Sequence, residues 1–138
     1  MSHELWIHKF VDGEAVAPGM GVIKAVLQPH SVKSTPPVVR DDESIAIWIR
    51  ASDGGEAELV ASESGIVVDR PAGGEILGII AELVSQLGAV IIDPRDGAFI
   101  CGAEERVHLP AEYQQDAVII EMTGPALQDV TTGPPRQR

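Results

Sequence analysis

The sequence predicts an α+β domain in which one principal amphipathic helix, at about residues 74–87, packs on one face of an antiparallel β-sheet. Two observations predict this class. Residues 44–70 hold three short runs rich in β-branched residues and separated by turn sequences, and the helical segment carries apolar residues at helical spacing. With 138 residues, 44% of them hydrophobic, the chain can bury a core without a disulfide or a metal. We expect a single domain over residues 1–130 and a disordered tail over residues 131–138.

The N-terminal segment begins with a predicted strand. Residues 4–11 alternate imperfectly, which favours a strand, and Asp12 with Gly13 then gives a turn signal. Residues 22–27 are apolar but too few for periodicity to separate a buried strand from a short helix. Three prolines favour an extended surface loop over residues 28–40. The sequence therefore leaves the structure of residues 18–40 open.

Three consecutive antiparallel strands are predicted next. In residues 44–50 three isoleucines share one face and Trp48 lies on the other. A turn at residues 52–55 leads into residues 56–61 and completes a hairpin, and residues 65–70 form the third strand.

The helix that follows is the best-defined element. Gly88 stands where a glycine ends a helix, and seven apolar residues lie on one face, opposite polar ones: Ile76, Leu77, Ile79, Ile80, Leu83, Val84 and Leu87. Residues 89–93 suit a strand buried on both faces, and a turn leads from them into residues 98–101. A short helix starting at Pro110 and a last β-rich run at residues 118–122 complete the prediction.

The charge of the chain is acidic and unevenly distributed. Ten Lys and Arg against 21 Asp and Glu give a formal net charge of −11, which opposes binding to nucleic acid and to anionic membranes. Residues 1–40 hold four basic and three acidic residues, whereas residues 41–138 hold six and 18. Seven acids with one arginine lie between residues 41 and 63, and they serve either solubility alone or a basic protein partner: Asp41, Asp42, Glu43, Asp53, Glu56, Glu58 and Glu63.

No residue pattern predicts a cofactor, a metal site or a catalytic residue. The four histidines lack the i, i+2 and i, i+4 spacings that bring two imidazoles to one metal, and nucleotide-binding and hydrolase motifs do not occur. An alternative site is a pocket near Cys101, Glu104, Glu105 and His108, where a Cys and a His meet across a loop. Because Cys101 alternates with Phe99 on a predicted strand, we expect it in the core instead.

The compartment is predicted from three features. The N-terminus lacks the basic start, apolar run and cleavage site of a secretory signal, and no apolar stretch approaches the ~18 residues of a membrane span. A single cysteine suits a reducing compartment. We expect a cytoplasmic protein.

The helical segment and the strand after it resemble small acidic α+β immunity proteins that accompany bacterial polymorphic toxins. The resemblance covers residues 74–94, from Gly74-Glu-Ile-Leu-Gly through Leu-Gly88 into Ala-Val-Ile-Ile-Asp-Pro, and it transfers no functional residue. It implies a non-enzymatic inhibitor that binds a cognate toxin.

The sequence supports three hypotheses of function. The first is a non-enzymatic cytoplasmic module, an immunity or inhibitor protein among them, whose acidic surface binds a basic protein such as a toxin. The second is a small enzyme or ligand-binding domain that uses the pocket near Cys101. The third is a homo-oligomer in which exposed Trp6 or Trp48 marks the contact between copies.

Overall fold

The computed structural model describes residues 4–34, 36–39, 43–69, 71 and 73–131. Within these residues the strands are β1 (Leu5–Val11), β2 (Glu14–Val16), β3 (Val38–Val39), β4 (Ile45–Arg50), β5 (Glu56–Ser62), β6 (Gly65–Asp69), β7 (Val90–Asp93), β8 (Ala98–Cys101) and β9 (Val118–Ile119). The helices are α1 (Met20–Leu27), the 3-10 turn η1 (Gln28–His30), α2 (Glu75–Leu87), α3 (Ala103–Arg106), α4 (Ala111–Gln114) and α5 (Gly124–Thr131).

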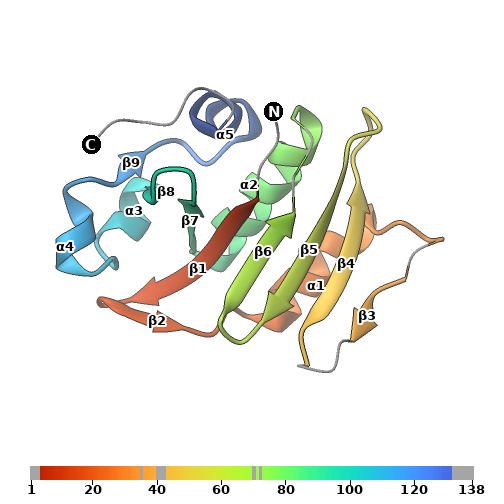
Figure 1. Cartoon of the computed structure of the whole chain (residues 1–138), viewed down its shortest axis with the longest axis horizontal. Helices are drawn as coiled ribbons and strands as arrows, with labels where there is room; N and C mark the ends of the chain where they lie inside the picture. The colour runs from red at the N-terminus through yellow and green to blue at the C-terminus, as the bar shows by residue number, and fades with distance from the viewer. Residues whose placement is uncertain (1–3, 35, 40–42, 70, 72, 132–138) are drawn as a thin grey trace.

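The described strands form one sheet in the order β3-β4-β5-β6-β1-β7-β8-β9, and β2 pairs with β1 beside this path (Figure 1). Strands β4, β5 and β6 form the predicted meander. The N-terminal strand β1 lies between β6 and β7 and is antiparallel to both. The middle of the sheet is thus built from segments that are far apart in the sequence.

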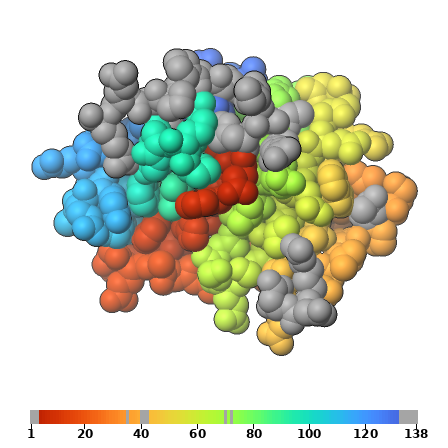
Figure 2. Space-filling model, viewed as in Figure 1, coloured from red at the N-terminus to blue at the C-terminus, as the bar shows by residue number. Residues whose placement is uncertain are grey.

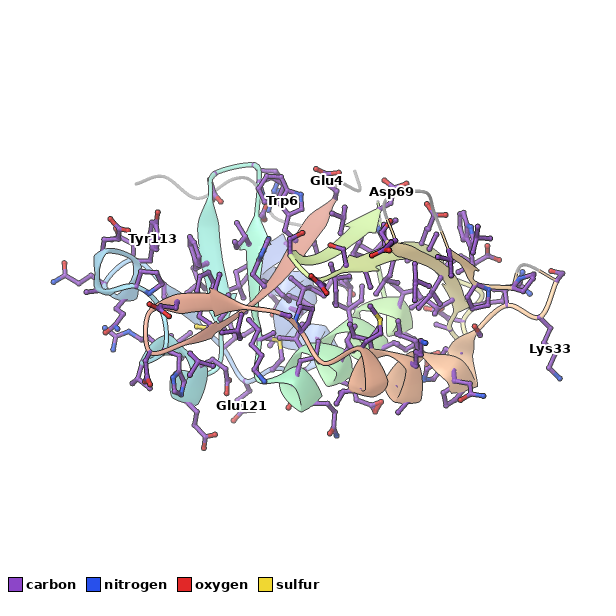
Figure 3. All side chains as sticks on the ribbon, turned by 90° about the horizontal axis from the view of Figure 1, so that it is seen from below. Glu4, Trp6, Lys33, Asp69, Tyr113 and Glu121 are labelled. Carbon is purple, nitrogen blue, oxygen red and sulfur yellow. The ribbon has the colours of Figure 1, made fainter. Side chains whose placement is uncertain are left out.

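The hydrophobic core lies between the sheet and helices α1 and α2, which lie on the same side of it (Figures 1 and 3). All seven apolar residues predicted for the helix stripe are buried. They belong to one core with alternate residues of the strands, such as Ile7, Ile49 and Leu59. Gly88 ends α2 in the left-handed conformation, with φ of 64°. The predicted α+β class is confirmed.

Residues 18–40, whose structure the sequence left open, contain a second helix on this side of the sheet. Helix α1 buries Ile23 and Leu27, which are four residues apart and therefore share one helical face. The residues expected to form only an extended loop include η1 and β3, and Ser31 makes an isolated bridge to Ile49. The sequence left a buried strand and a short helix open for residues 22–27, because so short a segment gives periodicity too few turns to show, and the structure has the helix.

The C-terminal part departs from the prediction in three ways. The sheet, which the sequence predicts to be antiparallel, is mixed, because β9 runs parallel to β8 after the chain crosses over through α3 and α4. The β-rich run at residues 118–122 forms only the two-residue strand β9. Helix α5 was not predicted, and Thr131, placed in the tail, is its buried last residue; residues 132–138 lie outside the described residues.

Candidate functional site

One part of the sheet carries no described helix on the side opposite α1 and α2. In Figure 3 the side chains of Glu4, Trp6 and Asp69 point away from the two helices. Figure 2 looks onto this side, where β5 and β6 form a continuous part of the surface. We define the open face by side chains of β4, β5, β6, β1 and the residue just before β1, none of which is buried: Glu4, Trp6, Ala46, Trp48, Arg50, Glu56, Glu58, Val60, Val67 and Asp69.

An acidic row crosses the open face. Trp48 pairs with Glu58, and Glu58 pairs with Asp69 on the next strand. Because Leu5 pairs with Val68, the same register places Glu4 beside Asp69. The carboxylates of Glu58 on β5, Asp69 on β6 and Glu4 just before β1 are therefore neighbours, with a tryptophan at one end of the row. Carboxylates in adjacent positions repel one another, so this row favours a cationic partner.

An apolar row lies next to the acidic row. Ala46 pairs with Val60, Val60 with Val67, and Val67 with Trp6. Val67 is 38% exposed even though it lies in the interior of the sheet. The two rows are joined at Trp6, whose indole Nε1 donates a hydrogen bond of 3.0 Å to Glu4 Oε1. The open face thus offers apolar contact and negative charge side by side.

Two of the seven acids predicted to bind a partner have partners within the chain. Glu56 forms an ion pair of 2.6 Å with Arg50 and is neutralised there. Asp53 accepts hydrogen bonds from the backbone N–H groups of Gly55 (2.9 Å) and Glu75 (3.1 Å), which lower its pKa. Asp53 therefore ties the β4–β5 turn to the start of α2.

The other predicted acids do not gather on one surface. Glu58 lies in the acidic row, whereas Glu43 precedes β4 and Glu63 lies in the β5–β6 turn, both exposed at the opposite end of the strands from Asp53. Asp41 and Asp42 lie outside the described residues. Of the five described acids, only Glu58 and the paired Glu56 lie on the open face.

The alternative pocket near Cys101 is not formed by its four predicted residues. Cys101 is completely buried against Val90 and Leu109, and burial raises the pKa of its thiol to about 11. His108 instead faces the β1–β2 turn, where its Nδ1 accepts a hydrogen bond of 3.3 Å from the Asp12 N–H. Glu104 and Glu105 line a shallow hollow that includes neither Cys101 nor His108.

The buried Asp93 also has a structural role. Its carboxylate is fully buried and forms an ion pair of 2.9 Å with Arg95. Hydrogen bonding to Asp93 raises the pKa of Arg95. Asp93 also accepts the Arg95 backbone N–H at 3.1 Å, so this pair stabilises the turn between β7 and β8.

The described residues contain no group of three His, Cys, Asp or Glu side chains arranged to hold a metal ion. No helix in that part of the chain has the length and apolar composition needed to cross a membrane. Comparison of the chain with protein-family models, with curated proteins and with solved structures finds no significant match.

Glu4, Asp69 and the placement of both tryptophans on the open face were not predicted from the sequence. Alternation within residues 4–11 and 65–70 places Glu4 with Trp6, and Val67 with Asp69, on one face of each strand. The insertion of β1 beside β6 then brings those two faces together, and no local pattern reports that pairing.

Proposed function

We propose that this protein is a non-enzymatic binding module that takes a basic polypeptide segment on its open face. The observation that supports this proposal is the acidic row of Glu4, Asp69 and Glu58 beside an apolar row. Among the described residues, the one arginine that reaches this face is already paired with Glu56. The face is therefore complementary to a segment that brings its own cations.

The residue types on the open face suit the binding of arginine and lysine side chains in particular. Their aliphatic stems can lie on Val60 and Val67, while the charged groups reach the adjacent carboxylates. Tryptophan is the best aromatic partner for a cation, and Trp6 and Trp48 lie beside the acidic row. A net charge of −11 also steers a basic partner toward the protein and raises the association rate.

An immunity protein of the bacterial cytoplasm, as the sequence resemblance implies, is one form of this function. Such an inhibitor would cover a basic surface of its toxin with the open face. The proposal needs no catalytic group, and buried Cys101 is unsuited to act as one.

The test uses octa-arginine as the probe and tryptophan fluorescence as the readout. Both tryptophans of the chain belong to the open face, so a peptide bound there changes their emission directly. We expect saturable binding at low salt that weakens as salt is added. Octa-glutamate, the control peptide, should leave the emission unchanged.

Matched charge reversals then locate the binding. Glu58→Lys with Asp69→Lys changes the acidic row, whereas Glu82→Lys with Glu112→Lys changes the net charge equally at exposed positions of α2 and α4. The first pair should weaken binding by roughly tenfold or more at low salt, and the second pair by much less. Equal losses in the two double variants would mean that only net charge matters, and the proposal would be wrong. Thermal melting of both variants checks that folding is preserved.

A further inference from the structure

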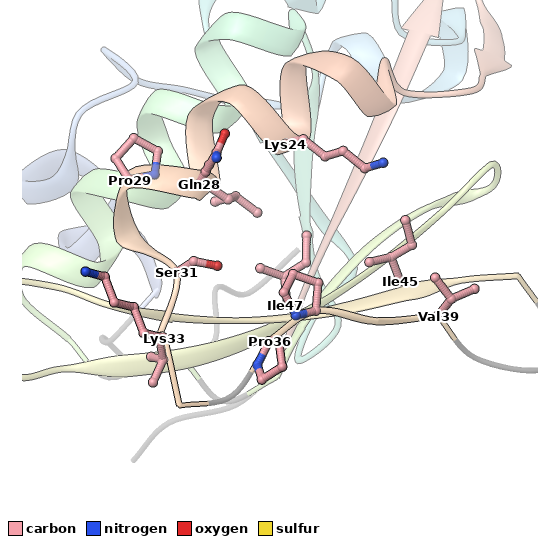
Figure 4. A pocket seen from close by; sticks show the side chains of 12 residues that line it. Lys24, Gln28, Pro29, Ser31, Lys33, Pro36, Val39, Ile45 and Ile47 are labelled. Atoms are coloured by element: carbon pink, nitrogen blue, oxygen red, sulfur yellow. The ribbon is translucent and has the colours of Figure 1, made fainter.

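A second surface feature lies at the β3 edge of the sheet, on the same side as the core. Helix α1 and η1 form one wall of a hollow of about 660 Å³, and β4 with the segment around Pro36 and Val39 forms the other (Figure 4). This volume lies within the range of about 300–1,000 Å³ that is typical of small-molecule sites.

The inner wall of the hollow is part of the hydrophobic core. Leu27 and Ile47 line it and are only 1% and 3% exposed, and the partly buried Ile45 lies beside them. The remaining lining is largely apolar, with several prolines and valines. An aliphatic group placed here would contact side chains that already exclude water.

The charge of the hollow is opposite to that of the whole chain. The protein has three lysines, and two of them, Lys24 and Lys33, line this hollow, whereas none of the described residues that line it is Asp or Glu. Neither lysine makes an ion pair with another described residue. Figure 4 shows Lys24 reaching out from α1 and Lys33 from the segment that follows η1, with Ile47 on β4 between them.

We propose that this hollow binds an aliphatic monocarboxylate. The alkyl chain lies on Leu27, Ile45 and Ile47, and the carboxylate lies at an end of this apolar lining, beside the ammonium group of Lys24 or of Lys33. Apolar contact supplies the affinity, and the lysines select an anion over a neutral or cationic amphiphile. This ligand differs in charge from the partner proposed for the open face and binds on the other side of the sheet.

Calorimetric titration with hexanoate, octanoate and decanoate, below their micellar concentrations, tests the proposal. Affinity should rise about fourfold for each added methylene, because each one buries its apolar surface. Octanol and octylamine, which have the same chain without the negative charge, should bind more weakly than octanoate. The proposal is wrong if decanoate does not bind, or if the three eight-carbon compounds bind equally.

Lysine variants locate the carboxylate. Lys24→Met with Lys33→Met keeps the aliphatic stems but removes both charges, and should weaken octanoate binding by about two- to fivefold. Lys9→Met is the matched control, since Lys9 lies on β1 and does not line the hollow. Octanol binding should be the same in all variants. An equal loss of octanoate affinity in Lys9→Met would overturn the assignment of the carboxylate to Lys24 or Lys33.

Amide chemical shifts separate this site from the open face. Octanoate should shift the amide signals of Leu27 and Ile47 and leave both tryptophan indole signals in place. Shifts confined to the indoles would place the ligand on the open face and overturn the proposal.

Discussion

Helices α2 and α5 cross at two glycines, and an alanine at each should have opposite effects on stability. A Cβ atom on Gly124 would lie 2.9 Å from the Cα and the backbone nitrogen of Gly78. Because these two Gly78 atoms belong to the backbone, they cannot rotate away, and the two helices must separate to make room for the Cβ atom. A Cβ atom on Gly78 would meet nothing within 4 Å. The two substitutions add the same methyl group on either side of one contact.

The magnitudes follow from these two environments. Forcing a group into a packed contact costs about 1–3 kcal/mol, so Gly124→Ala should lower the free energy of unfolding by that amount. Gly78 is inside α2, where glycine costs roughly 0.5–1 kcal/mol relative to alanine, so Gly78→Ala should raise it. For 138 residues the entropy of unfolding near the melting temperature is about 290 cal/mol/K. The melting temperature should therefore fall by roughly 3–10 °C in the first variant and rise by about 2–3 °C in the second.

Differential scanning calorimetry on both variants and the wild type measures these shifts, and urea denaturation gives the free energies independently. The urea slope should stay the same, which shows that the stability and not the unfolded state has changed. If Gly124→Ala melts at or above the wild-type temperature, the two helices do not depend on this close approach. A lower melting temperature for Gly78→Ala would contradict the open space beside Gly78.

Three further predictions concern other parts of the fold. Leu83→Ala should cost about 2–5 kcal/mol by urea denaturation, because it leaves a cavity in the middle of the α2 stripe, and an unchanged midpoint would mean that α2 is not packed. Cys101 should react with a thiol reagent at pH 8 only after denaturation, because burial raises its pKa to about 11; stoichiometric labelling of the folded protein within seconds would contradict this. Asp53 has a lowered pKa in the folded state, so the stability that its charge contributes is present above its ordinary pKa and is lost as the pH falls through the folded value. Asp53→Asn should therefore be less stable than wild type at pH 7, and this difference in stability should disappear in acid. A difference in stability that does not depend on pH would exclude the charge of Asp53 as its cause.

Elements whose information is local could be predicted from the sequence. The spacing of Ile76, Leu83 and Leu87 with Gly88 predicted α2 within a residue or so, because a helix of this length repeats its apolar stripe several times. Turn residues between alternating runs predicted the β4–β5–β6 meander, since neighbouring strands joined by short turns have little choice of partner.

The position of β1 between β6 and β7 could not be predicted, because strand pairing over a long separation leaves no local pattern in the sequence. That pairing places Glu4 beside Asp69 and Glu58, and so creates the acidic row. The tertiary structure also decided short elements such as α1 and β3, since packing against the sheet outweighs the weak preferences of a few residues. The hollow between α1 and β4 forms only when the helix packs against the sheet. Two lysines nine positions apart in the sequence therefore reach one site only in the folded chain.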